Sequence, residues 1–257
     1  MAEARHRQLD QPPGVPALEL TGERTLPDVP AENYWFQRHL AVYEWVRARV
    51  GGLRVIDMAC GEGYGSAVLA RTASSVVGVD ANPEAHEHAR LRYRRPNLRF
   101  EQALVEEFTA PCDALVFLQT IEHMREPGAV LDHFATLLAP GGAVYISTPN
   151  VLTLAPDGVR SDNPWHVREY RPEEFERLLL ERFAEVDLLG LFHARKLAAH
   201  EFALDRLSWD AVHERLGITK RFYDRFVPAI DVDDFVLSRV DSSFLGKSLD
   251  VIAVCRR

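Results

Sequence analysis

An apolar run, a glycine-rich turn and the start of a helix follow one another in residues 55–66, VIDMACGEGYGS. Glycines let a ligand approach the backbone, and the first turn of a helix offers N–H groups that have no partner inside the helix. Asp57 ends this apolar run, and Asp80 ends the next one, 23 residues later (80 − 57). An acid at that second position binds ribose hydroxyls in nucleotide-binding α/β sheets. The pattern predicts a pocket for a nucleoside-containing ligand.

Two kinds of ligand suit such a pocket, a dinucleotide and S-adenosylmethionine. A carboxylate at Asp57 repels a pyrophosphate, whereas it can pair with an ammonium group. Ser66 occupies the third glycine position of the dinucleotide pattern. Both observations favour S-adenosylmethionine, which has an α-amino group and no phosphate, and they disfavour a dehydrogenase. A turn that only connects a strand to a helix is the structural alternative.

Short apolar segments alternate with helical ones along most of the chain, which predicts a mainly parallel sheet covered by helices on both faces. The expected strands are 53–58, 75–80, 97–102, 113–119, 143–149, 184–192 and 248–255, and the expected helices are 31–50, 66–73, 82–92, 127–138, 172–183 and 197–217. About 55 residues separate the last two strands, too many for a plain connection. We therefore expect a helical cap insertion over residues 194–246.

Composition limits the remaining options. The 257 residues carry 30 basic and 38 acidic side chains, and the net charge of −8 argues against a nucleic-acid partner. Cys60, Cys112 and Cys255 are far apart and lack CxxC spacing, so they predict neither a disulfide framework nor a zinc site and fit a reducing cytoplasm. No apolar run approaches the roughly 18 residues of a membrane span. Residues 1–19 have no signal-peptide core and are expected to form a flexible tail.

Several motifs resemble those of the class I S-adenosylmethionine-dependent methyltransferases. Asp57-x-x-Cys60-Gly61-x-Gly63 is similar to the first motif of the family, and LQTIEH (118–123) and LLAPGG (137–142) resemble two later ones. The resemblance implies one domain over residues 20–257, with a Rossmann-like seven-stranded sheet whose last strand is antiparallel. It also implies a set of cofactor-binding residues: Asp57, Ala59, Gly61, Gly63, Asp80, Ala81, Leu118 and Gln119. Ala59 stands where many members have glycine. Residues 102–104 lack the acid that many members place near the adenine, which leaves the adenine contact open.

A narrower resemblance comes from GERTLP (22–27), STPN (147–150) and NPWHVREY (163–170). These segments are similar to bacterial, especially actinobacterial, methyltransferases associated with glycan and polysaccharide biosynthesis. The resemblance implies O-methylation of a sugar hydroxyl in the cytoplasm, on an oligosaccharide or small-molecule acceptor. An O-methyltransferase of a quinone, phenol or other natural product is an alternative, and an S-adenosylmethionine-binding regulatory domain is the non-enzyme alternative. The oligomeric state stays open, with a homodimer among the options.

Methyl transfer from a sulfonium mainly requires that the acceptor atom is aligned with the methyl group. An oxygen acceptor must also lose a proton. His123 follows the fourth expected strand, and imidazole titrates near working pH, so His123 is our first candidate for the general base. The other candidates are Glu122 and His166 for catalysis, Asn150, His166, Tyr34 and Trp35 for the acceptor, and Arg38, together with Tyr34 and Trp35, for closing over the cofactor. Helix capping, loop hydrogen bonds or core packing are the structural alternatives for these residues.

A divalent metal is a further option at Glu122 and His123. These two residues resemble the metal-binding pair of quinone-synthesis O-methyltransferases, which usually have Glu-x-x-Glu-His. Gln119 replaces the first acid here. Because one strong oxygen ligand is lost, we do not favour a magnesium-type site and assign no metal ligand.

Overall fold

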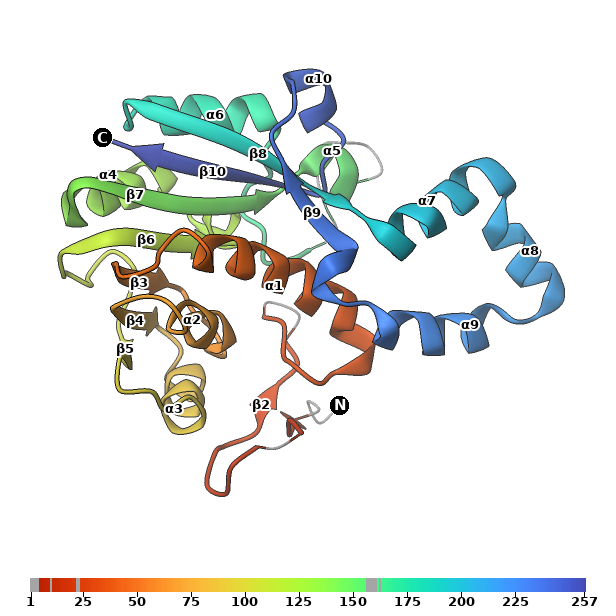
Figure 1. Ribbon diagram of the computed structural model, residues 1–257, viewed down its shortest axis with the longest axis horizontal. Helices are drawn as coiled ribbons and strands as arrows, with labels where there is room; N and C mark the ends of the chain where they lie inside the picture. The colour runs from red at the N-terminus through yellow and green to blue at the C-terminus, as the bar shows by residue number, and fades with distance from the viewer. Residues whose placement is uncertain (1–4, 10, 22–23, 156–160, 162) are drawn as a thin grey trace.

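The computed structural model describes residues 5–9, 11–21, 24–155, 161 and 163–257. Its main sheet has eight strands in the order β5-β4-β3-β6-β7-β10-β8-β9 (Figure 1). The strands are β3 (Arg54–Met58), β4 (Ser75–Asp80), β5 (Leu98–Gln102), β6 (Cys112–Leu118), β7 (Leu138–Pro149), β8 (Glu185–His193), β9 (Phe235–Ser238) and β10 (Asp250–Arg256). Strands β3 to β7 are parallel, and β10 runs antiparallel to both β7 and β8. This confirms the predicted Rossmann-like sheet with its antiparallel last strand.

Strand β9 makes the count eight instead of the expected seven. It pairs antiparallel with β8 at the edge of the sheet, from Gly190 opposite Ser238 to His193 opposite Phe235. Only four residues long, it lies directly after the acidic segment 231–234. Four residues are too few to show an alternating apolar pattern, so the sequence did not predict this strand.

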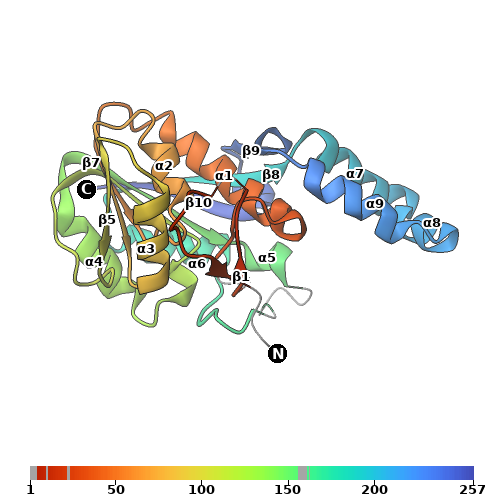
Figure 2. The same ribbon diagram turned by 90° about the horizontal axis from the view of Figure 1, so that it is seen from below.

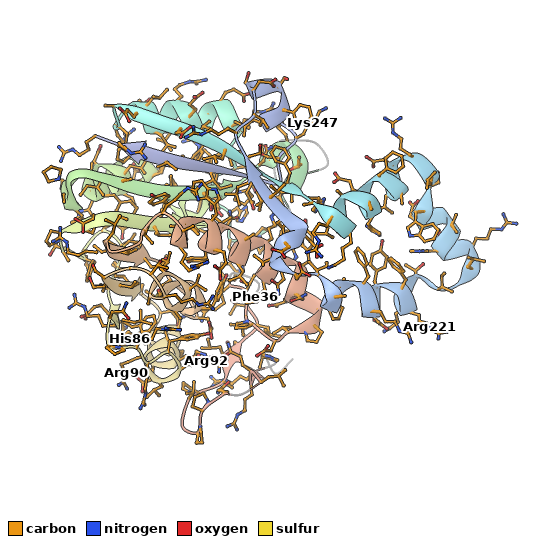
Figure 3. All side chains as sticks on the ribbon, in the orientation of Figure 1. Phe36, His86, Arg90, Arg92, Arg221 and Lys247 are labelled. Atoms are coloured by element: carbon orange, nitrogen blue, oxygen red, sulfur yellow. The ribbon has the colours of Figure 1, made fainter. Side chains whose placement is uncertain are left out.

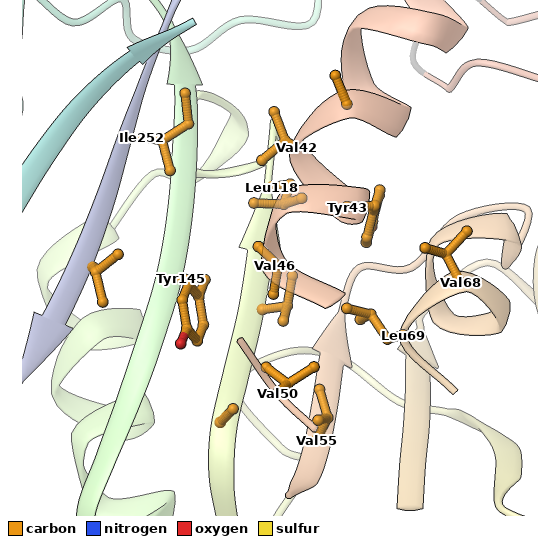
Figure 4. Packing of buried hydrophobic residues seen from close by; sticks show 14 of the residues in the cluster. Val42, Tyr43, Val46, Val50, Val55, Val68, Leu69, Leu118, Tyr145 and Ile252 are labelled. Atoms are coloured by element: carbon orange, nitrogen blue, oxygen red, sulfur yellow. The ribbon is translucent and has the colours of Figure 1, made fainter. Parts of the chain in front are cut away.

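Helices cover both faces of the sheet, as predicted. One face is covered by α1 (Asn33–Arg47) and α2 (Tyr64–Leu69), and the other by α4 (Pro127–Leu137) and α6 (Pro172–Leu180), while α3 (Pro83–Arg92) contacts β4 and β5. Figure 4 shows side chains of α1 and α2 packed against the strands, with Val46 and Leu69 close to Val55. The strands are thus buried from both sides. This explains why their sequences are continuous apolar runs rather than alternating apolar and polar residues.

The turn between β3 and α2 depends on glycine. Gly63 precedes α2 with a φ of 96°, a conformation that other residues rarely adopt. A Cβ atom at this position would also lie 2.8 Å from the Cβ of Ala89 on α3. Gly63 therefore lets the turn pass close to α3 while leaving the first turn of α2 open towards the carboxyl edge of the sheet.

The N-terminal segment differs from the flexible tail that we expected. Its described residues include a two-stranded sheet of β1 (Arg5–His6) and β2 (Leu18–Glu19). The Gln8 amide donates to the Glu62 carboxylate at 2.6 Å, and His88 Nδ1 lies 2.7 Å from the carbonyl oxygen of Pro16. These partners are more than 50 residues away in the sequence, so composition alone could not indicate them.

Residues 194–246, for which we expected a cap, form these elements: α7 (Arg195–Leu207), α8 (Trp209–Leu216), α9 (Thr219–Phe226), η3 (Val227–Ala229), η4 (Val232–Asp234), β9 and α10 (Ser242–Leu245). We expected one helix over residues 197–217, but Ser208 adopts a φ of 49° and separates α7 from α8. Helices α7 to α9 extend away from the sheet as an arm (Figures 1 and 2). Among the described residues, no helix is long and apolar enough to cross a membrane.

Candidate active site

A cavity of about 360 Å³ opens where β3, β4 and β6 end. Ligands of open α/β sheets bind at this carboxyl edge. The cavity brings together six of the residues expected to bind the cofactor: Ala59, Gly61, Asp80, Ala81, Leu118 and Gln119. The sequence therefore indicated six of the sixteen lining residues, because these six lie at or just after the ends of predicted strands.

Asp80 lies at this cavity with its carboxylate oriented by the backbone. Its Oδ2 accepts a hydrogen bond from the Gly61 N–H at 2.7 Å, and its Oδ1 accepts one from the Asn82 N–H at 2.9 Å. Each carboxylate oxygen has a further lone pair that can accept another hydrogen bond. The half-buried carboxylate is thus prepared to accept from hydroxyl groups of a ligand.

We expected Asp57 and Gly63 to bind the cofactor, but neither residue lines this cavity. Asp57 is buried, and its carboxylate accepts hydrogen bonds from Ser66 Oγ at 2.6 Å and Tyr43 OH at 3.2 Å. Burial raises the pKa of this carboxyl to about 7. Tyr43 does line the cavity. Asp57 therefore contributes to the cavity wall indirectly, by accepting the hydrogen bond that orients Tyr43.

Two other wall residues have unusual backbone conformations. Ala59 has a φ of 55° and Gln119 a φ of 51°, although neither is glycine. Such conformations cost free energy and are concentrated at functional sites. The glycine that many family members carry would remove this strain at position 59.

A second cavity of about 530 Å³ adjoins the first. Five residues line both cavities, namely Arg24, Thr25, His39, Gln119 and His123. The shared residues mark the junction at which a group could pass from a ligand in one cavity to a ligand in the other.

Glu122, His123 and His166 meet in this second cavity. Each offers a ligand atom, and the three atoms lie within 4.8 Å of one another. Glu122 and His123 belong to the short helix η2 (Ile121–His123), whereas His166 comes from the segment after β7. The carbonyl oxygen of Glu122 accepts from the N–H groups of Val167 and Arg168 at 2.9 and 3.0 Å, which holds that segment against η2. The structure therefore assembles all three of the predicted catalytic residues.

Each side chain of this cluster has a hydrogen-bond partner. His123 Nδ1 lies 2.9 Å from the carbonyl oxygen of Trp165, and His166 Nδ1 lies 2.9 Å from Glu169 Oε1. The Glu122 carboxyl accepts from Thr148 Oγ1 at 3.1 Å, and burial raises its pKa to about 8. These contacts hold both rings by their Nδ1 atoms, beside the Glu122 carboxyl.

Three residues that we expected to contact the cofactor or the acceptor instead make contacts within the protein. Arg38 lines neither cavity; it is buried in an ion pair with Asp250, with Nη2–Oδ1 and Nε–Oδ2 distances of 2.6 and 2.8 Å. Tyr34 OH lies 2.8 Å from His193 Nε2. Asn150 is buried and caps α5 (Val151–Leu154), while its amide donates to backbone carbonyls of residues 245–248. Trp35 does line the second cavity.

The sequence analysis missed Arg24, Thr25 and His39, although the first two fall in the motif GERTLP. His39 Nδ1 lies 3.4 Å from Thr25 Oγ1, which in turn lies 3.1 Å from Tyr64 OH. Burial lowers the pKa of His39 to about 4. The ring is therefore uncharged at neutral pH, in a wall that the two cavities share.

Comparisons with known proteins agree with this geometry. Residues 18–199 match a family model described as a methyltransferase domain. A probable S-adenosylmethionine-dependent methyltransferase of Mycolicibacterium smegmatis is 35% identical over 246 residues, covering 94% of this chain and 96% of that protein. One of Mycobacterium tuberculosis is 39% identical over 202 residues, covering 75% and 73%. The crystal structure of a methyltransferase of this kind from Mesorhizobium loti shares the fold, with a TM-score of 0.54 and 17% identity over 84% of this chain and 98% of that one.

Proposed function

This chain belongs to the class I S-adenosylmethionine-dependent methyltransferases, and from that premise we propose that it methylates a hydroxyl oxygen of a carbohydrate in glycan or polysaccharide biosynthesis. The observation that carries the proposal is the second cavity, which joins the cofactor cavity and contains the cluster of Glu122, His123 and His166. A hydroxyl acceptor needs such a cluster because its oxygen must lose a proton as it is methylated.

The lining of the second cavity offers groups that a carbohydrate acceptor can use. Ten of its fourteen residues are polar or charged, and the other four are Ala31, Trp35, Pro149 and Leu154. Trp35 is 42% exposed and offers an aromatic face, while Arg24, Ser161 and Asn163 offer hydrogen-bonding groups. A sugar ring needs many such polar partners, whereas a phenol would be better matched by an apolar wall.

The first cavity fits the cofactor. Asp80 has the acceptor oxygens for ribose hydroxyls, and the wall from Ala59 to Gly61 presents backbone close to a ligand. When bound, S-adenosylmethionine supplies an activated methyl group: the acceptor oxygen forms the new carbon–oxygen bond, the carbon–sulfur bond breaks with its electron pair staying on sulfur, and the hydroxyl proton is lost. The protein then has to align the two ligands and assist the loss of that proton. His123 lines both cavities, so it is the cluster member that we propose to act at the transfer point.

An Asp80→Ala substitution is expected to weaken S-adenosylhomocysteine binding by about 1 to 3 kcal/mol, because charge-assisted hydrogen bonds to the ribose are lost. Isothermal titration calorimetry would measure the change. Asp113→Ala is the matched control, since Asp113 pairs with Arg54 near the start of β6, at the opposite edge of the sheet. Equal affinity of the Asp80 variant and the wild type would remove Asp80 from the ribose site.

The function itself is tested by product identification. The purified protein is incubated with methyl-labelled S-adenosylmethionine and, in parallel, with neutral oligosaccharides, phenols and a cell extract. We expect label in an oligosaccharide fraction that is stable to base, as a methyl ether is and a methyl ester is not. Label that appears only in phenols would refute the carbohydrate acceptor while leaving methyl transfer intact.

A further inference from the structure

We propose that Glu122, His123 and His166 bind a divalent first-row transition metal, such as Zn²⁺ or Co²⁺, in the acceptor cavity. Our sequence-based expectation considered only the segment 119–123 and did not favour a metal. The third ligand comes instead from His166, 43 residues beyond His123 (166 − 123). The inference deepens the proposed function, because it concerns the same cavity and the activation of the same hydroxyl.

The positions of the three ligand atoms support a common cation. They lie within 4.8 Å of one another, and zinc is bound at about 2.0 to 2.2 Å by imidazole nitrogen and carboxylate oxygen. Side-chain movements of about an ångström would bring all three into contact with one ion. The rings of His123 and His166 are nearly perpendicular, at 86° and with centroids 5.0 Å apart, so their nitrogens approach a common point from different directions.

The hydrogen-bond partners of the three candidate ligands are of the kind that orient metal-binding residues in proteins. Such histidines almost always donate their other ring N–H to a carbonyl or a carboxylate, which fixes the tautomer and raises ligand basicity. His123 has the carbonyl oxygen of Trp165 at its Nδ1, and His166 has the Glu169 carboxylate. Glu122 in turn accepts from Thr148. All three ligands therefore have a hydrogen-bond partner of the appropriate kind.

A bound cation would give the buried Glu122 carboxyl an ionic partner. Glu122 is 1% exposed, and no lysine or arginine in the described part of the chain forms an ion pair with it. A buried carboxylate is costly unless it is paired or coordinates a metal. Two imidazoles and one carboxylate suit zinc, cobalt or iron better than magnesium, which takes oxygen ligands.

Three protein ligands would leave a coordination position for the acceptor. Catalytic zinc sites have three protein ligands and an open position, and the metal lowers the pKa of an oxygen bound there. In the proposed site a sugar hydroxyl would take this position and would lose its proton to water. His123 then serves as a ligand, which replaces the need for a free imidazole base at the same nitrogen.

The test uses Co²⁺, whose absorption spectrum reports its ligands, on tag-free full-length protein without cofactor or acceptor. We expect one Co²⁺ per chain with the spectrum of a nitrogen- and oxygen-ligated ion, and competition by Zn²⁺ in calorimetry. Glu122→Gln and His166→Ala should each weaken binding by at least about 100-fold. Glu169→Gln changes the carboxylate that holds His166 and Ser161, and it should weaken binding by about 10- to 100-fold.

The control is His86→Ala, which removes a histidine of α3 that lies outside both cavities (Figure 3). Circular dichroism and the unfolding midpoint show whether each variant is folded, and Glu122→Gln keeps the shape of the side chain. Absence of Co²⁺ binding by the wild type, or binding that is equal in the wild type and both ligand variants, would overturn the proposal. Since no acceptor is needed, such a result would leave the proposed methylation standing, and the product assay can fail without affecting metal binding.

Discussion

An Arg38→Met protein is expected to lose about 3 to 5 kcal/mol of unfolding free energy, the cost typical of removing one partner of a buried ion pair. The Arg38 side chain is 5% exposed and that of Asp250 is fully buried, with a distance of 2.6 Å between Nη2 and Oδ1. Methionine keeps much of the apolar stem but leaves the Asp250 carboxylate without its cation. The pair joins α1 to β10, so its loss should affect the whole domain rather than one loop.

Urea denaturation followed by circular dichroism would measure this loss. Arg54→Met is the matched control, because Arg54 forms an ion pair with Asp113 in which its own side chain is 49% exposed. Exposed pairs typically contribute about 0 to 1 kcal/mol. A stability loss below 1 kcal/mol for Arg38→Met, combined with weaker S-adenosylhomocysteine binding, would instead support our initial assignment of Arg38 to the cofactor.

The contrast between Arg38 and the cofactor turn shows what the sequence can predict. Gly61 and Asp80 were placed correctly because each directly follows or ends a predicted strand, and parallel strands present their carboxyl ends at one edge. The partner of Arg38 is 212 residues away. The local sequence pattern does not distinguish an arginine that faces a ligand from an arginine that forms an ion pair with the last strand.

The acceptor cluster was predictable in its members but not in its geometry. Glu122 and His123 are adjacent in the sequence, and His166 lies in a segment with several polar residues. Their meeting depends on two backbone hydrogen bonds from Val167 and Arg168 to Glu122. Backbone hydrogen bonds carry no residue signature, so the sequence could nominate three separate candidates but could not combine them into one cluster.

The second large effect concerns His123, whose replacement by alanine should lower the rate of methyl transfer by at least about 10²-fold. The rate is measured with labelled S-adenosylmethionine and the acceptor identified in the product assay. Cofactor affinity should change much less, because the cofactor wall keeps Asp80 and the turn after β3. His86→Ala provides the control, with an expected rate close to that of the wild type. A His123→Ala enzyme with wild-type turnover would exclude the residue from the reaction.

The double variant His123→Ala/His166→Ala distinguishes how the cluster acts. If the two rings hold one cation, either single substitution removes its function, and residues that act as a unit are strongly non-additive. We therefore expect His166→Ala to be about as slow as His123→Ala and the double variant to be no slower than either. A free base at His123 predicts the opposite pattern, in which His166→Ala retains most of the rate and a chelator leaves the wild type unchanged. Equal losses in the two single variants, combined with inhibition of the wild type by a chelator, would point to a common ion.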